Sequence, residues 1–271
     1  MYALQGKVAV VTGAGSGIGR ALAQLLATKG CRLAIADINE LGLAETAASL
    51  PSPPLMQKLD VADRAAVYAF AERVKKELGT AHVVINNAGV AVSQTVADLT
   101  YEDFEWIMGI NFWGVVYGTK AFLPMMQSQN DGVVVNISSV FGIIAVPTQS
   151  SYNAAKFAVR GFTESLRHEL AGSGVSAICV HPGGIKTNIA ASSRFYVDPQ
   201  GLSDAKKAAA NFQKLAQTTP AQAAQTIVSG IEQGNPRVLI GGDAKVIDWV
   251  QRLMPVNYWK LMQALMKRMK K

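Results

Sequence analysis

The chain has 271 residues, of which 49% are hydrophobic and 17% are charged, a balance that excludes a disordered or collagen-like protein. The net charge is +7, but residues 251–271 hold six of the 26 basic residues and no acidic one, which leaves 20 basic against 19 acidic residues elsewhere. A nearly neutral body without a basic face or interleaved aromatic residues argues against nucleic-acid binding.

The amino-terminal residues enter a strand-like run directly, without the basic segment and long apolar stretch of a secretory leader. We therefore expect a cytoplasmic protein. No apolar run reaches the roughly 18 residues that a membrane-spanning helix needs, although association with a membrane surface stays open. Cys31 and Cys179 each lie beside a short apolar run, and we expect buried thiols rather than a disulfide.

Short β-branched runs alternate along the chain with longer segments of helical periodicity. Strands are predicted near residues 7–12, 32–36, 55–59, 82–86, 132–137, 175–181 and 237–240. Helices are predicted near residues 18–29, 40–50, 63–78, 100–128, 151–172 and 220–233. This alternation predicts an α/β fold, namely a Rossmann-like, doubly wound parallel sheet with right-handed crossovers.

We expect a single dinucleotide-binding and catalytic domain over residues 1–243. The proline-rich residues 51–54 form a loop inside it and mark no boundary. Residues 190–218 lack strand character and carry turn-forming residues, which predicts a mobile excursion with a short helix that serves as a substrate lid. Residues 244–271 are expected to form a basic, amphipathic C-terminal extension.

A glycine-rich run, TGAGSGIG at residues 12–19, joins the first strand to the first helix. Its glycines let backbone N–H groups approach a pyrophosphate, and the helix N-terminus supplies partial positive charge. A tight turn without a ligand is the alternative. A Walker-type phosphate loop is disfavoured, because no Lys-Ser or Lys-Thr pair closes the run.

The second strand ends at Asp37, eighteen residues beyond Gly19, where dinucleotide folds place a carboxylate against the adenosine ribose. That carboxylate would repel a 2′-phosphate, and neither Ser16 nor Ile38 offers a cation for one. The sequence therefore favours NAD over NADP. The alternative role for Asp37 is to cap the next helix.

Two further polar segments follow strand ends. Asp60 ends the third strand, where it could meet the adenine edge, but it could also cap the next helix, and Asp63 competes for that role. Residues 86–89, with the sequence NNAG, follow the fourth strand at the edge where such folds bind ligands. A purely structural turn is the alternative for this segment.

Of seven tyrosines, only Tyr152 has a lysine four residues later, and this spacing puts Tyr152 and Lys156 on one helix face. An ammonium roughly 5 Å away at an effective dielectric of roughly 20 stabilises a phenolate by about 3 kcal/mol, which lowers its pKa by about two units. Tyr152 then qualifies as a general acid and base for an alcohol or a carbonyl. A packed aromatic ring beside a solvated lysine is the alternative.

Ser139 follows the fifth predicted strand and is placed to donate a hydrogen bond to a substrate oxygen. Asn111 is a polar residue among apolar and aromatic neighbours, where it needs a partner if buried. We expect it to hold a backbone kink or a water. His82, His168 and His181 lack ligand spacing, so each is expected to be exposed or satisfied, and no metal site is expected.

Together these motifs resemble those of a classical short-chain dehydrogenase/reductase over about residues 6–240. The motifs that carry the resemblance are TGAGSGIG at 12–19, Asp60-Val61, NNAG at 86–89, Asn111, Ser139, YNAAK at 152–156 and PGGIKT at 182–187. They occur in the order and spacing of that family.

The resemblance implies a catalytic tetrad of Asn111, Ser139, Tyr152 and Lys156. Tyr152 is implied as acid and base, Ser139 as the group that orients the substrate, and Lys156 as ribose binder and electrostatic activator. Asn111 is implied as the anchor of a water-linked proton path. Ile185 and Thr187 match positions that contact the nicotinamide carboxamide. The motifs and the resemblance give these expected dinucleotide contacts: Gly13, Ser16, Gly17, Ile18, Gly19, Asp37, Asp60, Val61, Asn87, Ala88, Gly89, Tyr152, Lys156, Pro182, Gly183, Ile185 and Thr187.

The family also implies the sheet order 3-2-1-4-5-6-7 and a homodimer or homotetramer, with the helices near 100–128 and 151–172 at the main interface. Mostly apolar residues are candidate walls for the substrate: Val90, Ala91, Val92, Phe141, Gly142, Ile143, Ile144, Pro147, Gln149, Phe195 and Tyr196. They favour a hydrophobic alcohol or ketone, although such residues at strand ends are often only core.

The C-terminal extension carries two apolar helical patterns, one on each side of Pro255, with basic residues beside them. Residues 251–271 could lie on an anionic membrane, cover the active-site mouth or pack on a neighbouring subunit. Two classes of function follow. The first is an oxidoreductase that uses NAD, and the second is a cofactor-binding scaffold or membrane-surface protein that acts through this extension.

Overall fold

The computed structural model describes residues 1–199 and 201–269, with side chains as far as residue 264 in the last helix. Seven parallel strands form its central sheet, in the order β3-β2-β1-β4-β6-β7-β9. Their bounds are Val8–Thr12 (β1), Arg32–Asp37 (β2), Leu55–Lys58 (β3), Val83–Asn86 (β4), Gly132–Ile137 (β6), Val175–Pro182 (β7) and Arg237–Ile240 (β9). The strands β5 and β8 belong to a separate pair. Counted within the main sheet, the predicted order is confirmed.

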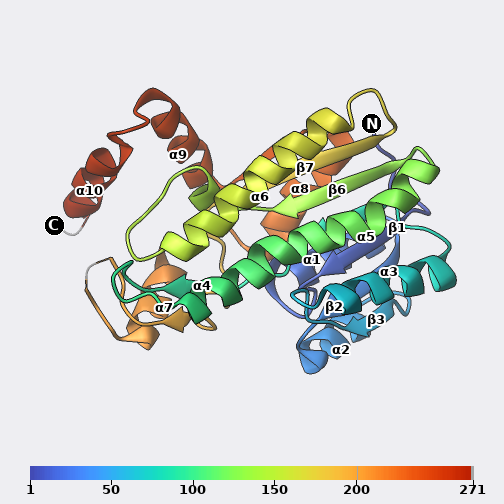
Figure 1. Cartoon of the computed structure of the whole chain (residues 1–271), viewed down its shortest axis with the longest axis horizontal. Coiled ribbons are helices and arrows are strands. Elements are labelled where there is room, and N and C mark those ends of the chain that lie inside the picture. The colour runs from blue at the N-terminus through green and yellow to red at the C-terminus, as the bar shows by residue number, and fades with distance from the viewer. Residues whose placement is uncertain (200, 270–271) are drawn as a thin grey trace.

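Helices cover both faces of the sheet (Figure 1). Successive residues of a strand point to opposite faces, so the apolar strands present side chains to helices on both sides. Ala9 and Val11 of β1 pack on one face, with the helices α1 (Gly17–Thr28), α2 (Glu40–Ala48) and α8 (Pro220–Gln233). Val8 and Val10 pack on the other, with α3 (Arg64–Leu78), α5 (Gly114–Ser128) and α6 (Ser150–Glu169). The predicted doubly wound α/β fold is therefore confirmed.

The segment predicted as one helix over 100–128 consists of three parts. Helix α4 (Tyr101–Met108) passes into a π-helical turn (Gly109–Trp113), which continues as α5. A π-helical turn widens the helix by one residue and often occurs at functional sites. Asn111 lies within it, so the expected backbone irregularity at this residue is present.

The segment 190–218 differs from its prediction in one respect. Arg194–Phe195 form a short strand, β8, which pairs in parallel with β5 (Val92–Ser93). Arg194 also bonds to the carboxylate of Asp103 at 2.7 Å and lies 3.8 Å from the ring centre of Trp106. The first part of the segment is thus attached to α4 through Arg194. The predicted short helix is also present as α7 (Ala205–Leu215), and none of its side chains is buried.

The C-terminal extension consists of two helices, α9 (Gly242–Leu253) and α10 (Tyr258–Met269), which are separated at Pro255 as predicted. They project from the body at the edge of the sheet formed by the carboxyl ends of the strands (Figure 1). We call residues 242–269 the C-terminal arm. Among the described residues, no helix is long and apolar enough to cross a bilayer. Cys31 and Cys179 are free, buried thiols, as expected.

Candidate active site

The glycine-rich turn leaves backbone donors free at the start of α1. Gly13 and Gly17 adopt positive φ angles of 66° and 51°, a region that disfavours other residues. A side chain at Gly19 would collide with the carbonyl oxygen of Gly13. Ser16 occupies the N-cap of α1 but makes no side-chain capping bond among the described contacts, so the first N–H groups of the helix lack that partner. This cradle fits a pyrophosphate.

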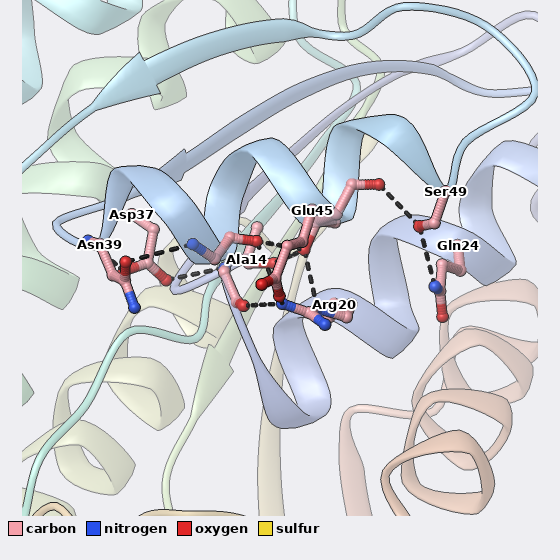
Figure 2. A network of polar contacts seen from close by, with 10 residues as sticks. Ala14, Arg20, Gln24, Asp37, Asn39, Glu45 and Ser49 are labelled. Carbon is pink, nitrogen blue, oxygen red and sulfur yellow. Dashed lines mark hydrogen bonds and ion pairs between the residues drawn. The ribbon is translucent and has the colours of Figure 1, made fainter.

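Asp37 lies directly against this turn (Figure 2). Its Oδ2 accepts a hydrogen bond from the Gly15 N–H at 2.8 Å, and its Oδ1 accepts one from the Asn39 N–H at 2.8 Å. The N-cap of α2 is Asn39, whose side chain accepts from Gly42. The capping alternative for Asp37 is therefore wrong, and its carboxylate stays beside the glycine turn.

Arg20 holds the glycine turn to α2, a role that the sequence analysis missed. Its Nη2 donates to the carbonyls of Gly15 at 2.6 Å and Gly42 at 3.2 Å, and its Nε donates to the Thr46 hydroxyl at 3.0 Å. Glu45 completes the set with an ion pair at 2.7 Å (Figure 2). A basic residue directly after the glycine run was the available signal. The Nε and Nη2 groups of Arg20 therefore already have partners within the protein.

The residues after β4 bond to the end of β1. The amide of Asn87 donates to the carbonyls of Thr12 at 2.9 Å and Gly13 at 3.2 Å. The N–H groups of Asn87 and Ala88 donate to the Thr12 hydroxyl. Asn87 thus has the structural role that was the alternative for this segment, since it holds the glycine-rich turn in place. Gly89 follows, and a Cβ there would lie 3.6 Å from Lys156 Nζ.

Asp60 is not the cap of α3. Asp63 caps that helix by accepting from Ala66 N–H at 3.0 Å. Asp60 accepts from Ala62 N–H at 2.9 Å and remains exposed at the end of β3. Its neighbour Val61 is buried. The competition between the two aspartates is therefore settled in favour of Asp63, which leaves Asp60 at the sheet edge where ligands bind.

The structure brings Ser139, Tyr152 and Lys156 together. Lys156 Nζ lies 5.6 Å from the ring centre of Tyr152 and donates to the carbonyl of Ile137, the last residue of β6, at 2.9 Å. Ser139 follows two residues later, close enough to the Tyr152 side chain to favour a lower pKa of the phenol. Phe141 packs edge-on against the Tyr152 ring, with 6.1 Å between the ring centres.

The expected lowering of the tyrosine pKa is wrong for this structure. Burial raises the pKa of Tyr152 to about 12, although Ser139 beside it acts in the opposite direction. Burial also lowers the pKa of Lys156 to about 8. The spacing of the two residues accounts for the attraction between their charges, but the cost of removing each charge from water is larger in this buried site.

Asn111 is fully buried and bonds to both backbone groups of Val90. Its Nδ2 donates to the Val90 carbonyl at 2.9 Å, and its Oδ1 accepts from the Val90 N–H at 2.8 Å. A Cβ at Gly89 would lie 3.2 Å from Asn111 Oδ1 and 3.6 Å from Lys156 Nζ. The π-helical turn thus brings Asn111 to the same glycine that Lys156 approaches.

His181 holds the backbone of Ser139 by a hydrogen bond, a role that its position in the sequence does not indicate. Its Nδ1 lies 3.0 Å from the Ser139 carbonyl oxygen, so Nδ1 must carry the proton. The ring is buried, and Nε2 has no hydrogen-bond partner among the described residues. His181 is therefore neither exposed nor fully satisfied, contrary to expectation. Burial lowers its pKa to about 4.

The segment after β7 lies across the glycine turn. The side chain of Thr187 approaches Gly17, where a Cβ would meet the threonine methyl group at 3.1 Å. Ile185 is buried and pairs with Thr218. Gln213 of α7 donates to the Thr187 carbonyl at 2.5 Å, which ties α7 to this segment. Pro182 ends β7, and the Gly183 N–H donates to Ile240.

Some of the candidate substrate walls belong to the packed interior. Val92, Ile143 and Ile144 are almost completely buried, which leaves them little surface for a substrate. Phe141 and Tyr196 remain partly or largely exposed. The alternative that some of these residues are core is therefore confirmed. Among the described residues, no cluster of His, Cys, Asp or Glu could hold a metal ion.

Known proteins resemble this chain in both sequence and fold. Residues 7–195 match the family described as short chain dehydrogenase. SadH of Mycobacterium tuberculosis, which is named as an oxidoreductase, is 48% identical over 97% of this chain and 96% of its own length. The chain therefore belongs to the short-chain dehydrogenase/reductase family of oxidoreductases.

Two solved structures show the same relationship. A short-chain dehydrogenase/reductase from Burkholderia phymatum in complex with NAD is 30% identical, covers 93% of this chain and 95% of its own, and gives a TM-score of 0.86. An alcohol dehydrogenase from the archaeon Thermococcus sibiricus, complexed with 5-hydroxy-NADP, is 25% identical over 84% of this chain and 91% of its own, with a TM-score of 0.72. These neighbours hold different dinucleotides, so the preference must be argued from this chain's own residues.

Replacing Arg20 by Leu should loosen the glycine turn. We expect about 1–2 kcal/mol less stability to urea, because several charge-assisted hydrogen bonds to a half-exposed side chain are lost, and about tenfold weaker NADH binding by fluorescence titration. Arg73→Leu is the matched control, since Arg73 also joins a carbonyl and a carboxylate but contacts β3 and α3. Equal effects of both variants on NADH affinity would contradict a role for Arg20 in shaping the turn.

Acid should destabilise the protein through His181. Its pKa is about 4 when folded against an ordinary value of 6.5, so between these values the unfolded state binds the extra proton. This contribution to stability is complete above about pH 6.5 and falls as the pH falls toward 4, by up to roughly 3 kcal/mol. Urea midpoints measured across this range should fall less steeply for His181→Gln. The exposed His168 gives the control, His168→Gln, and equal slopes in both variants would refute this assignment.

Proposed function

We propose that the protein transfers a hydride between NAD(H) and a hydrophobic secondary alcohol or ketone, with Tyr152 as the acid and base. The observation that supports this most is the grouping of Ser139, Tyr152 and Lys156 at the carboxyl edge of the sheet. Gly89 connects this group with the dinucleotide cradle, because Lys156 Nζ approaches it closely. The scaffold alternative would leave this grouping without a role.

In the oxidation direction, Ser139 orients the alcohol oxygen and Tyr152 accepts its proton. In the reduction direction, Tyr152 returns that proton to the carbonyl oxygen. A dinucleotide held in the glycine-rich cradle would supply the acceptor or the donor of the hydride. Lys156 stabilises the phenolate as long as its amine is protonated, and burial lowers the pKa of that amine to about 8. The nearby carboxamide of Asn111 anchors the water-linked path by which the proton leaves.

The preference for NAD rests on Asp37. Both oxygens of its carboxylate accept backbone N–H groups beside the glycine turn, and a 2′-phosphate there would meet a negative charge. Arg20 is the nearby cation, but its Nε and Nη2 groups are directed at two carbonyls, a hydroxyl and Glu45. We therefore assign the 2′-hydroxyl of NAD to Asp37.

The substrate is bound beneath the segment 190–218, which acts as its lid. Helix α7 buries no side chain, and Gln213 bonds it to Thr187 beside the glycine turn. A helix held by so few contacts opens at low cost. Phe141, edge-on to Tyr152, provides an apolar ring next to the reacting group, which supports a hydrophobic substrate.

The protein acts as a cytoplasmic homodimer or homotetramer. Support comes from aromatic side chains on the outer faces of the helices that the family uses for assembly. Trp113, beside α5, is 47% exposed and stacks on Tyr117, and Phe157 of α6 is 41% exposed. Exposed aromatic clusters of this kind mark protein interfaces.

Replacing Tyr152 by Phe removes only the hydroxyl that carries the proton. Turnover with any active alcohol or ketone, followed by NADH absorbance, should fall at least about 100-fold, while NADH affinity changes little. Tyr68→Phe, on the exposed side of α3, should keep full activity. If Tyr152→Phe retained most of the turnover, Tyr152 would not be the acid and base.

Replacing Asp37 by Ser should reduce the discrimination between dinucleotides. We expect the unaltered protein to bind NADH at least about tenfold more tightly than NADPH, and the variant to lose most of this ratio. Glu40→Gln removes a nearby charge that pairs with Lys58 and should leave the ratio unchanged. Tighter binding of NADPH by the unaltered protein would contradict the assignment of Asp37.

A further inference from the structure

We propose that the C-terminal arm docks the protein on an anionic lipid surface. The first observation is the apolar face of α9, where Val246, Trp249 and Leu253 are 60%, 67% and 74% exposed. These residues are spaced by three and four positions, so they lie on one side of the helix. A soluble helix normally buries such a face, but this one turns it outward.

The outward orientation of this face is fixed by the opposite side of α9. Ala244 and Asp248 are buried there, and Asp248 forms a two-point ion pair with Arg237 of β9. Asp243 accepts from the Gly184 N–H at 2.7 Å. These contacts hold the helix to the sheet, so it cannot turn its apolar face inward without breaking a buried ion pair.

Helix α10 extends the same pattern. By its sequence, Leu261, Leu265 and Met269 recur at four-residue spacing, and Lys260, Lys267 and Arg268 lie beside them in the chain, which is the pattern of helices that lie in a membrane interface. The Tyr258 hydroxyl at its start bonds to both backbone groups of Ala145, at 3.0 and 3.2 Å. Ala145 lies between Ser139 and Tyr152 in the chain, so the arm stands beside the active-site end of the sheet (Figure 1).

Charge identifies the occupant of this surface. Residues 251–271 carry six basic residues and no acidic one, whereas the rest of the chain is nearly neutral. Two such arms repel each other, and the body of a second copy offers no excess of negative charge. An anionic bilayer offers an apolar interior to the exposed face of α9 and negatively charged headgroups to the basic residues. Because none of the described helices can cross a bilayer, the arm lies on the surface.

The test is sedimentation of the full-length protein with lipid vesicles. We expect binding to vesicles of mixed phosphatidylcholine and phosphatidylglycerol, little binding to phosphatidylcholine alone, and weaker binding as NaCl screens the charges. Trp249→Glu and Leu253→Glu should each weaken binding by about tenfold or more, since each puts a charge into the inserted face. Sedimentation does not depend on catalysis, so this result stands apart from the proposed reaction.

Leu41→Glu is the matched control, because Leu41 is 79% exposed on α2, outside the arm. It should bind vesicles like the unaltered protein, and all variants should keep their NADH affinity, which shows that they fold. Absence of binding to anionic vesicles at low salt would overturn the proposal. So would equal binding by Trp249→Glu. If Trp249→Glu instead split an oligomer in gel filtration while the unaltered protein ignored vesicles, the face would be an interface between copies.

Discussion

The buried ammonium of Lys156 must find a hydrogen-bond acceptor, and this requirement fixes much of the geometry around it. The acceptor is the carbonyl of Ile137, which the end of β6 leaves free. Ser138, the next residue, donates back to the Lys156 carbonyl at 2.8 Å. These two bonds join α6 to β6 and hold Tyr152 beside Ser139. Since the charge faces a carbonyl dipole rather than a carboxylate, it stays available to a phenolate.

The dinucleotide half of the site depends on backbone carbonyls in the same way. Arg20 and Asn87 direct their donors to carbonyls of the glycine turn, and Asp37 accepts from its N–H at Gly15. These side chains shape the turn and leave the start of α1 open to a phosphate. The parallel register of β1, β4 and β6 then places both halves of the site at one edge of the sheet.

Hydrophobic periodicity predicts the strands, and the four-residue spacing predicts that Tyr152 and Lys156 share a helix face, because both depend only on local geometry. The order of the strands and the complete tetrad follow only from the resemblance to the family. The sequence does not predict the bonds of Arg20 or the place of His181 beneath Ser139, since these depend on which carbonyl another element presents. The sequence also does not predict that the pKa of Tyr152 is raised, because the burial that raises it depends on the whole fold. The strand at Arg194–Phe195 is too short to leave a periodic signal.

We propose that one sheet edge holds NAD against Asp37 and presents its nicotinamide to Tyr152. A crystal structure of the protein with NAD would show both contacts at once. We predict the adenosine ribose hydroxyls within hydrogen-bonding distance of the Asp37 carboxylate, the nicotinamide ribose on Lys156 Nζ, and the nicotinamide ring facing the Tyr152 hydroxyl. A dinucleotide bound elsewhere, or one whose nicotinamide lies away from Tyr152 and Lys156, would rule out this arrangement.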